Sequence, residues 1–189
     1  HISTNHYSNS KMHDGNMLNF DLWLKESEND DRRRFNYLKD KITNKTLLDF
    51  GCGAGGFINL ARKISKKVSG IEIEKALHLK FKERGLNVFA NVNEAIENNS
   101  RWEIVSAFHV LEHTLDPLKT LISLSLLLEK QGELIIEVPN INDALLTIYN
   151  NKPFQDFNYW SNHLFMFNAK TLQALVKKAG FQVNWIEHI

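Results

Sequence analysis

The segment Leu47-Leu48-Asp49-Phe50-Gly51-Cys52-Gly53-Ala54-Gly55-Gly56 joins an apolar strand to a turn with four glycines in six positions. A helical pattern follows from Phe57. A strand, a glycine-rich turn and a helix in this order are typical of the first unit of a Rossmann-like nucleotide site. Gly51 can adopt φ values that are closed to other residues. Asp49, at the end of the strand, can accept a hydrogen bond from a loop amide or hold a cationic group of a ligand.

Two ligand classes fit the spacing of these glycines. Gly51, Gly53 and Gly56 match G-x-G-x-x-G, the dinucleotide pattern, in which glycines let the ligand and the next helix approach the backbone. The stretch from Asp49 to Gly55 also matches D-x-G-x-G-x-G, which resembles motif I of the class I S-adenosylmethionine (SAM)-dependent methyltransferases. A turn without a ligand would not need so many glycines, because each costs backbone entropy. The loop alone does not separate NAD from SAM.

The composition indicates a single globular domain. The chain has 189 residues, of which 43% are hydrophobic, and a formal net charge of +1, so no broad field gathers nucleic acid or anionic membrane. A single cysteine excludes an internal disulfide framework and fits a reducing compartment. No apolar run reaches the ~18 residues that span a bilayer. We therefore expect a cytoplasmic enzyme that acts on a small molecule, without nucleic acid or membrane insertion; its oligomeric state is open.

Residues 1–44 are expected to form a helical lid beside the ligand cleft. Apolar residues at helical spacing fall into two stripes: Phe20, Trp23 and Leu24, then Phe35, Leu38 and Ile42. Asp30 and Asp31 precede Arg32–Arg34, and acids ahead of bases suit the dipole of a helix that starts there. We interpret Arg32–Arg34 as a solvated helix face rather than as a nucleic-acid patch.

The next two strands carry candidate contacts to a nucleotide. Val68–Glu72 predicts a second strand that ends in an acid. Glu72 lies about 20 residues beyond the loop, where Rossmann-like folds place a ribose-binding carboxylate, although a plain surface acid is the alternative. Leu86–Phe89 predicts a short third strand. In related enzymes the turn that follows holds a polar residue against the adenine amine; Asn91 is our choice, and Asn93 is the alternative.

The expected fourth strand, Trp102–Phe108, leads into a sequence that imitates a metal motif. His109–His113 matches H-x-x-E-H, a zinc-protease pattern. That motif needs both histidines and the glutamate on one helix, whereas this segment leaves a strand. Asp116 is a good N-cap and Pro117 a good first helical residue, so the helix begins after the motif. We therefore reject the zinc-protease interpretation and expect no metal ion.

Strands that alternate with helices predict an α/β fold, a Rossmann-like doubly wound and mostly parallel sheet with helices on both faces. Glu133–Asn140 is the expected fifth strand. Phe181–Ile186 is the expected sixth, after a helix capped by Asn168. We divide the chain into the lid, residues 1–44, and a nucleotide-binding domain, residues 45–189.

Residues 141–168 interrupt the alternation. We expect an insertion that folds over the cofactor and builds the acceptor pocket, because long irregular segments in compact domains are usually functional. The segment mixes many aromatic residues with polar ones and matches neither the helix nor the strand period. The alternative is that the aromatics only cover the sheet edge. His163 is the first candidate for a general base and His113 the second, since histidine titrates near neutral pH.

Several segments together resemble the class I SAM-dependent methyltransferases, above all the branch of the ubiquinone-biosynthesis O-methyltransferases: Asp49–Gly56, Glu72, Phe108–His113 with Asp116 and Pro117, and Gly132–Asn140. The resemblance covers residues 45–189. Segments between Pro139 and Phe165 also resemble methyltransferases associated with sugar and surface-polysaccharide biosynthesis. The family fold has seven strands, so the resemblance implies that this sequence is truncated before the last strand.

The resemblance implies SAM as cofactor, S-adenosyl-L-homocysteine as product, and a small-molecule acceptor such as a hydroxyl of a sugar or glycan precursor. It assigns these residues to the cofactor: Asp49, Gly51, Cys52, Gly53, Gly55, Glu72, Ile73, Asn91, Phe108 and His109. The alternatives are an NAD-dependent oxidoreductase and a catalytically silent nucleotide-binding module. Neither Tyr149 nor Tyr159 is followed four residues later by lysine, so residues 141–168 lack the Tyr-x-x-x-Lys pair expected of a dehydrogenase.

Overall fold

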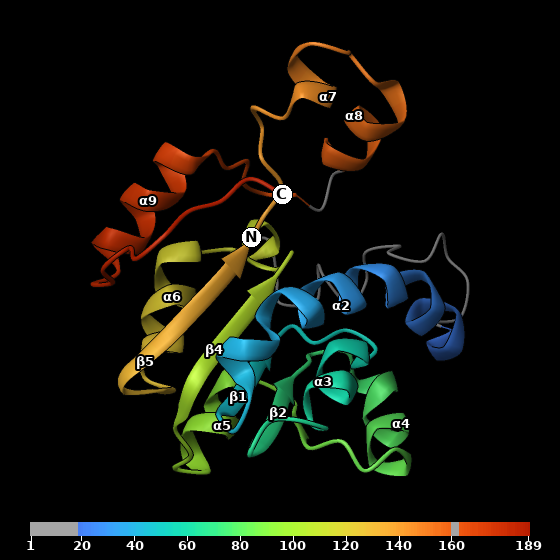
Figure 1. Ribbon diagram of the computed structural model, residues 1–189, viewed down its shortest axis with the longest axis vertical. Coiled ribbons are helices and arrows are strands. Elements are labelled where there is room, and N and C mark those ends of the chain that lie inside the picture. The colour runs from blue at the N-terminus through green and yellow to red at the C-terminus, as the bar shows by residue number, and fades with distance from the viewer. Residues whose placement is uncertain (1–18, 160–162) are drawn as a thin grey trace.

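A five-stranded parallel sheet forms the centre of the computed structural model, which describes residues 19–159 and 163–189 (Figure 1). The strands are β1 Thr46–Phe50, β2 Lys67–Ile71, β3 Val88–Phe89, β4 Trp102–Phe108 and β5 Leu128–Glu137. Their order is β3-β2-β1-β4-β5: the chain adds β2 and β3 on one side of β1, then crosses over and adds β4 and β5 on the other side. Open parallel sheets bind their ligands at such a switch point. The predicted Rossmann-like α/β fold is confirmed.

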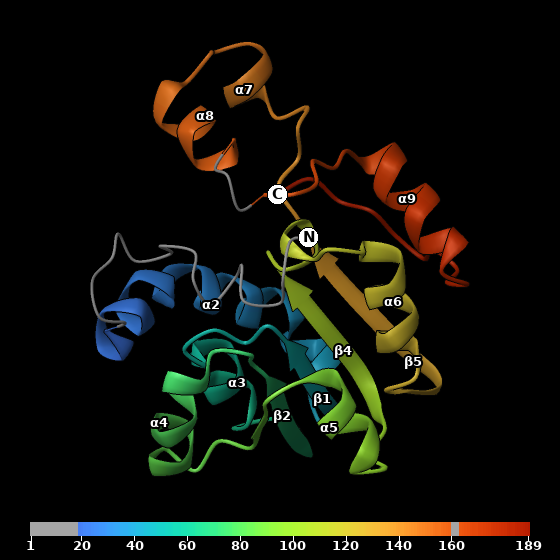
Figure 2. The same cartoon turned by 180° about the vertical axis from the view of Figure 1, so that it is seen from behind.

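Helices cover both faces of the sheet (Figures 1 and 2). They are α2 Phe20–Ile42, α3 Gly56–Ala61, α4 His78–Glu83, α5 Val92–Glu97 and α6 Pro117–Ser125. Successive strand residues point to opposite faces. In β1, Leu47 packs into the cluster with α2, α3 and α4, and Leu48 packs into the cluster with α5 and α6. Because both faces are buried there, the central strands β1 and β4 are mostly buried along their length rather than alternating between buried and exposed residues.

One continuous helix, α2, carries both apolar stripes of the expected lid. Asn19 caps it by accepting a hydrogen bond from the Leu22 amide at 3.1 Å, and the helix runs on to Ile42. The expected helix start at Asp30 and Asp31 is wrong. Asn19 already supplies the cap, and no glycine or proline interrupts the helix after it.

The arginine run of α2 does not behave as one solvated face. Arg32 pairs with Glu28 on the exposed side of the helix. Arg33 and Arg34 instead reach Glu137 at the end of β5. The Arg34 side chain is only 12% exposed, so the interpretation as a solvated face is wrong for this residue. The sequence did not show that α2 packs beside the end of β5, and this packing decides which of its arginines are buried.

Residues 141–159 hold two short helices where the sequence predicted an irregular segment. α7 spans Ala144–Thr147 and α8 spans Lys152–Asn158. Asp143 and Asn151 cap them with side-chain oxygens, a signal that the aromatic composition had obscured. The two helices contact each other and stand beyond the carboxyl ends of the strands (Figures 1 and 2).

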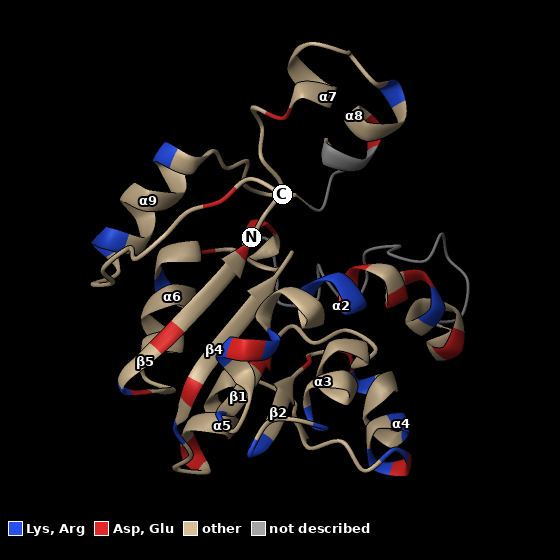
Figure 3. Cartoon of the chain, viewed as in Figure 1, with Lys and Arg blue, Asp and Glu red and all other residues tan. Residues whose placement is uncertain are grey.

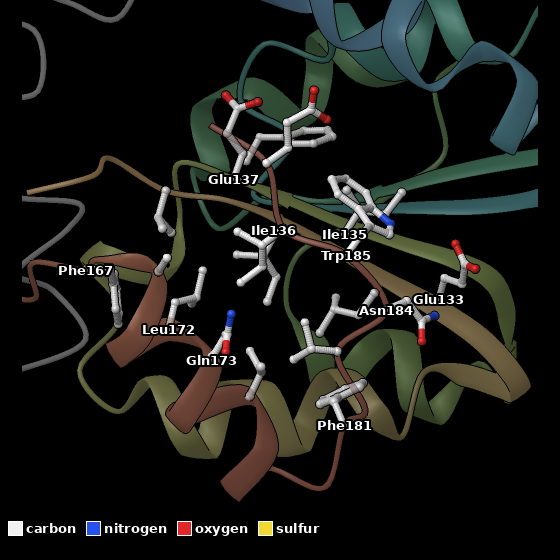
Figure 4. A pocket seen from close by; sticks show the side chains of 18 of the residues that line it. Glu133, Ile135, Ile136, Glu137, Phe167, Leu172, Gln173, Phe181, Asn184 and Trp185 are labelled. Carbon is white, nitrogen blue, oxygen red and sulfur yellow. The ribbon is translucent and has the colours of Figure 1, made fainter. Parts of the chain in front are cut away.

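The expected sixth strand at Phe181–Ile186 is wrong. α9, Ala169–Lys178, is followed by a tail that runs past β5 without joining the sheet. A groove of about 990 Å³ separates the edge of β5 from α9 and this tail. Asn184 and Trp185 project from the tail toward it (Figure 4). Because side chains stand between the two backbones, the alternating pattern of the tail has no strand with which to form a ladder.

In the part of the chain that the structure describes, no helix combines the length and the apolar content needed to cross a bilayer. Acidic and basic residues are interspersed along α2 and α4 rather than gathered by sign (Figure 3). This distribution agrees with the small formal net charge of +1.

Candidate functional site

The glycine loop lies at the carboxyl end of β1, beside the switch point of the sheet. Gly51, Gly53 and Gly55 all have left-handed φ angles, of +73°, +53° and +79°. Glycine reaches such angles without the steric cost that other residues carry, so the prediction for Gly51 is confirmed. The amides of Gly51 and Cys52 donate to the Ile71 carbonyl at 2.8 and 3.0 Å, which fixes the loop to the end of β2.

Helix α2 packs directly against this loop. A Cβ atom at Gly53 would lie 3.0 Å from Cζ2 of Trp23, whose indole covers the loop from α2. A Cβ atom at Gly56 would collide with the Asp31 carboxylate, which also belongs to α2. Glycine is therefore needed at both positions for close approach, and at Gly53 also for its left-handed backbone angle.

Glu72 follows β2 as a buried acid that is 5% exposed, so the alternative of a plain surface acid is wrong. Its carboxylate accepts hydrogen bonds from the amides of Gly53 and Glu74, each at 2.9 Å. Burial raises the pKa of Glu72, and the amide donors oppose that rise. A carboxylate has about four acceptor sites, so capacity remains for the two hydroxyls of a ribose. Ile73, 46% exposed, offers apolar surface beside it.

Asp49 is buried where β1 enters the loop, and Ser106 of β4 holds it. The Ser106 hydroxyl donates to Oδ1 at 2.7 Å and takes the place of the expected loop amide. Burial raises the pKa of Asp49 to about 7, although the serine hydroxyl and the Arg34 charge act in the opposite direction. Burial also raises the pKa of the Cys52 thiol well above its ordinary value, so Cys52 packs against the loop as a neutral thiol.

Asn91 follows β3 at the same edge of the sheet. Its side chain caps α5 by accepting a hydrogen bond from the Glu94 amide at 3.0 Å. Asn93, the second residue of this helix, is exposed as well. Contact with adenine stays a prediction for either residue.

An ion-pair network that the sequence analysis missed joins α2 to the ends of β4 and β5. Oε1 of Glu137 lies 2.9 Å from His109 Nε2, 2.7 Å from Arg34 Nη2 and 2.9 Å from Arg33 Nη2. The Arg34 guanidinium lies 5.0 Å from the centre of the Phe108 ring. The sequence offered one weak signal for this network, an acid at the end of an apolar strand.

His109 has a left-handed φ of +51°, and its ring lies between two acids. Nδ1 is 3.4 Å from Glu112 Oε1, on the side opposite to Glu137. Burial by itself would lower the pKa of His109, but the two carboxylates outweigh it and raise the pKa to about 9. Burial would likewise raise the pKa of Glu137, but His109 and the two arginines hold it well below its usual range. His109 is therefore positively charged at neutral pH.

A second cluster lies on the other side of Glu112. The segment Leu111–His113 forms a short 3-10 helix, η2. The amides of residues 164–165 donate to the Glu112 carbonyl at 2.9 and 3.1 Å, which fastens the end of the insertion against η2. This contact brings His163 beside His113, with their ring centres 4.8 Å apart. The structure thus unites the two histidines that the sequence proposed as alternative bases.

The ligand atoms of Glu112, His113 and His163 all lie within 4.8 Å of one another. Glu112 is 1% exposed, and neither of its side-chain oxygens has a hydrogen-bond partner among the described residues. The segment His109–His113 is not one helix, which confirms the premise on which the zinc-protease motif was rejected. The second imidazole near Glu112 comes instead from the far end of the insertion.

Known proteins show the family of this chain. The family model described as "Methyltransferase domain" matches residues 24–184. An uncharacterized protein of Methanocaldococcus jannaschii is 31% identical over 130 residues, which cover 67% of this chain and 55% of that protein. The ubiquinone biosynthesis O-methyltransferase of Serratia proteamaculans is 28% identical over 121 residues, which cover 58% of this chain and 50% of that enzyme. The chain spans about half the length of the curated relatives it matches.

A solved structure agrees. The SAM-dependent methyltransferase from Archaeoglobus fulgidus has a TM-score of 0.61 and 25% identity, over 82% of this chain and 69% of that one. The residues at the loop fit SAM, because the left-handed glycines admit a ligand close to the backbone and Glu72 offers acceptors for a ribose. The predicted resemblance to SAM-dependent methyltransferases is confirmed, and the chain belongs to the methyltransferase-domain family, whose cofactor is SAM.

Proposed function

We propose that this chain transfers the methyl group of SAM to an oxygen of a small-molecule acceptor. One observation carries the proposal: the Glu72 carboxylate, buried after β2, accepts a hydrogen bond from the Gly53 amide of the glycine loop at 2.9 Å. The bond places acceptors for ribose hydroxyls directly beside a backbone that a ligand can approach. SAM has a chemical group for each of these features: its ribose can bind the acceptors, and its compact charged chain can lie against the backbone.

The protein's part in this reaction is to position and enclose the reactants. The cofactor supplies an electrophilic methyl group on a sulfonium leaving group, so little covalent chemistry is left to side chains. Alignment of the acceptor with the methyl group, together with exclusion of water, then accounts for the rate. Trp23 covers the loop from α2, and the pair of Arg34 with Glu137 fastens that helix to the sheet. In our proposal these contacts close the cofactor side.

The acceptor side, we propose, lies at the end of β4 and in residues 141–168. His113 and His163 meet there, and an imidazole or an ion bound to it can help a hydroxyl to lose its proton. The relative from Serratia proteamaculans is an O-methyltransferase of ubiquinone biosynthesis, which supports oxygen as the accepting atom. Resemblance between Pro139 and Phe165 to polysaccharide-associated enzymes supports a hydroxyl of a sugar or glycan precursor.

Calorimetry with the purified chain tests the cofactor half of this proposal. SAM and S-adenosyl-L-homocysteine should bind, and NADH should not. Glu72→Gln should weaken SAM, whereas Glu74→Gln, which changes an acid two residues further along, should leave it near wild type. NADH binding in place of SAM would refute the proposal.

Methyl-labelled SAM and a panel of acceptors test the other half. We expect label to enter sugar nucleotides; label in hydroxylated aromatic compounds instead would assign the acceptor to the ubiquinone type. If SAM binds but no acceptor class is labelled, the chain is a binding module and the proposed transfer is wrong.

A further inference from the structure

We propose that Glu112, His113 and His163 bind one divalent transition-metal ion, and that this ion holds the accepting oxygen. The three side chains supply one carboxylate and two imidazoles, with ligand atoms within 4.8 Å of one another. They come from two distant parts of the chain, η2 and the end of the insertion, which meet at the carboxyl edge of the sheet.

The spacing of these atoms is close to that of a metal site. Ligands at bond lengths of about 2.0–2.1 Å stand roughly 3.3 Å apart around a tetrahedral ion. The three groups therefore need to close by about 1.5 Å at most, which rotation of two half-buried imidazoles provides. Backbone hydrogen bonds from residues 164–165 to the Glu112 carbonyl keep His163 within this reach.

The state of Glu112 points independently to a ligand. A buried charged group is normally paired or bound to metal. Glu112 is 1% exposed, yet within the described residues both of its oxygens lack a hydrogen-bond partner. His109 Nδ1 approaches Oε1 at 3.4 Å, which supplies charge on one side without satisfying the carboxylate. A cation between Glu112 and the two histidines would satisfy the oxygens that the ion pair with His109 leaves without a hydrogen bond.

The donor set selects the class of ion. Imidazole suits zinc, iron, nickel and copper, whereas magnesium and calcium favour oxygen ligands alone. Three protein ligands also leave at least one coordination position open, as in sites where a metal acts on a substrate. One carboxylate and two neutral imidazoles leave a divalent ion with a net charge of about +1, so an anionic oxygen is the favoured additional ligand.

The role in catalysis rests on the proposed methyl transfer. A divalent ion lowers the pKa of a bound hydroxyl, so the acceptor releases its proton to solvent at neutral pH. An electron pair of that oxygen then forms the bond to the methyl carbon. The carbon–sulfur bond breaks, its electron pair stays on sulfur, and S-adenosyl-L-homocysteine leaves as a neutral thioether. In this scheme His113 and His163 are ligands, and neither acts as the free general base that the sequence predicted.

Cobalt binding tests the site without any need for activity. The chain is stripped with EDTA and titrated with Co²⁺, whose visible absorption reports bound nitrogen and oxygen ligands, and Zn²⁺ is then added as a competitor. We expect one tight Co²⁺ per chain, displaced by Zn²⁺. Glu112→Gln and His163→Gln should each weaken binding by about 100-fold or more, since even changes behind the ligands cost 10–100-fold.

Two controls make the result specific. His188→Gln changes an exposed histidine of the tail and should leave Co²⁺ binding unchanged. The double change His6→Gln and His13→Gln removes histidines outside the described residues and should also have no effect. Circular dichroism of each variant separates loss of the site from loss of the fold, and His163→Gln, on a half-buried side chain, is the variant expected to fold normally.

Each outcome decides a different part of the proposal. Cobalt binding that survives in Glu112→Gln and folded His163→Gln, or that disappears with His6 and His13, overturns the site. With the site present, methyl transfer that EDTA abolishes and Zn²⁺ or Co²⁺ restores, at unchanged SAM affinity, supports the role. Transfer that EDTA leaves untouched overturns the role, and a pH profile that loses its acidic limb in His163→Gln would then assign His163 as the base. Absence of transfer under every condition refutes the methyltransferase proposal but not a metal site that Co²⁺ detects.

Discussion

Replacing Glu137 with glutamine removes the charge at the centre of the network that fastens α2 to the sheet. Glutamine keeps the length of the side chain and one carbonyl oxygen. In the wild-type chain a single oxygen of Glu137 faces Arg33, Arg34 and His109, at 2.9, 2.7 and 2.9 Å. In Glu137→Gln the same three cations surround a neutral amide. We expect the free energy of unfolding to fall.

Burial sets the size of this fall. The side chains of Arg34 and Glu137 are 12% and 14% exposed, so the pair is largely shielded from water. Without Glu137, the nearest acid among the described residues that pairs with Arg34 is Asp31, at 3.9 Å. Breaking one partner of a buried pair costs about 3–5 kcal/mol. Because glutamine still accepts hydrogen bonds, we expect about 3 kcal/mol, and Arg33, at 41% exposure, adds little.

Urea unfolding followed by circular dichroism measures the effect, and β5 supplies a matched control. Glu133 lies on the same strand and pairs with Lys41 of the same helix at 3.0 Å, but the two side chains are 38% and 40% exposed. Glu133→Gln should therefore cost less than about 1 kcal/mol. If Glu137→Gln costs no more than Glu133→Gln, burial does not control this network and the reasoning is wrong.

The same variant changes the pH dependence of stability. The folded pKa of His109 is about 9, above the unfolded value near 6.5. The stability that His109 gains from its acids is therefore fully present below about pH 6.5 and is lost as pH rises through about 9. In Glu137→Gln the pKa of His109 should fall, which an NMR titration of its ring protons measures. An unchanged His109 titration would contradict the assignment of Glu137 as a cause of the raised pKa.

Three further predictions concern the cofactor loop. Glu72→Gln should cost ~1–3 kcal/mol of SAM affinity, about 5–150-fold in Kd by calorimetry, and a change below twofold would show that Glu72 does not hold the ribose. Asp49 keeps its proton up to a folded pKa of about 7, far above the ordinary aspartate pKa of 3.8, so wild-type stability should fall as pH rises from about 4 to 7, by at most ~1.4 kcal/mol per pH unit. Asp49→Asn should flatten this slope in unfolding curves. Gly53→Ala should lower stability by more than Gly85→Ala. A Cβ at Gly85 meets no described atom within 4 Å, so that variant carries only the left-handed cost of ~1–2 kcal/mol, whereas a Cβ at Gly53 also meets Trp23. Equal losses of stability in thermal unfolding would exclude the contact with Trp23.

Local signals were sufficient for most of the fold. The apolar pair Leu47 and Leu48 indicates a strand that is buried on both faces. The glycines after it indicate the turn, where three of them adopt left-handed angles. Caps such as Asp116 place helix starts correctly, because the cap and the helix it begins are neighbours in sequence. Phe181–Ile186 shows the limit. Alternation specifies which face a side chain takes, but a strand also needs a partner backbone, and the tail stays on the far side of the groove from β5.

The candidate-site residues that directly follow a strand could be predicted from the sequence. The contacts between elements distant in sequence could not. Gly51 and Glu72 follow β1 and β2 directly, so the topology of a parallel sheet brings them together. Glu137 pairs with Arg34 across more than a hundred residues, and neither residue carries a pattern that names the other. The arginine run looked solvated because helical spacing shows the faces of α2 but not what the helix packs against.

The H-x-x-E-H pattern shows how one spacing can serve two sites. On a continuous helix the first and fifth residues share a face, which is why the zinc-protease motif requires a helix. Here the left-handed turn at His109 directs that ring toward Glu137, and η2 then directs His113 toward His163. Glu112 lies between the two histidines and is buried, with its carboxylate near both. The same five residues therefore join the network that holds α2 through His109 and face the proposed acceptor side through His113, a division that the sequence pattern alone does not reveal.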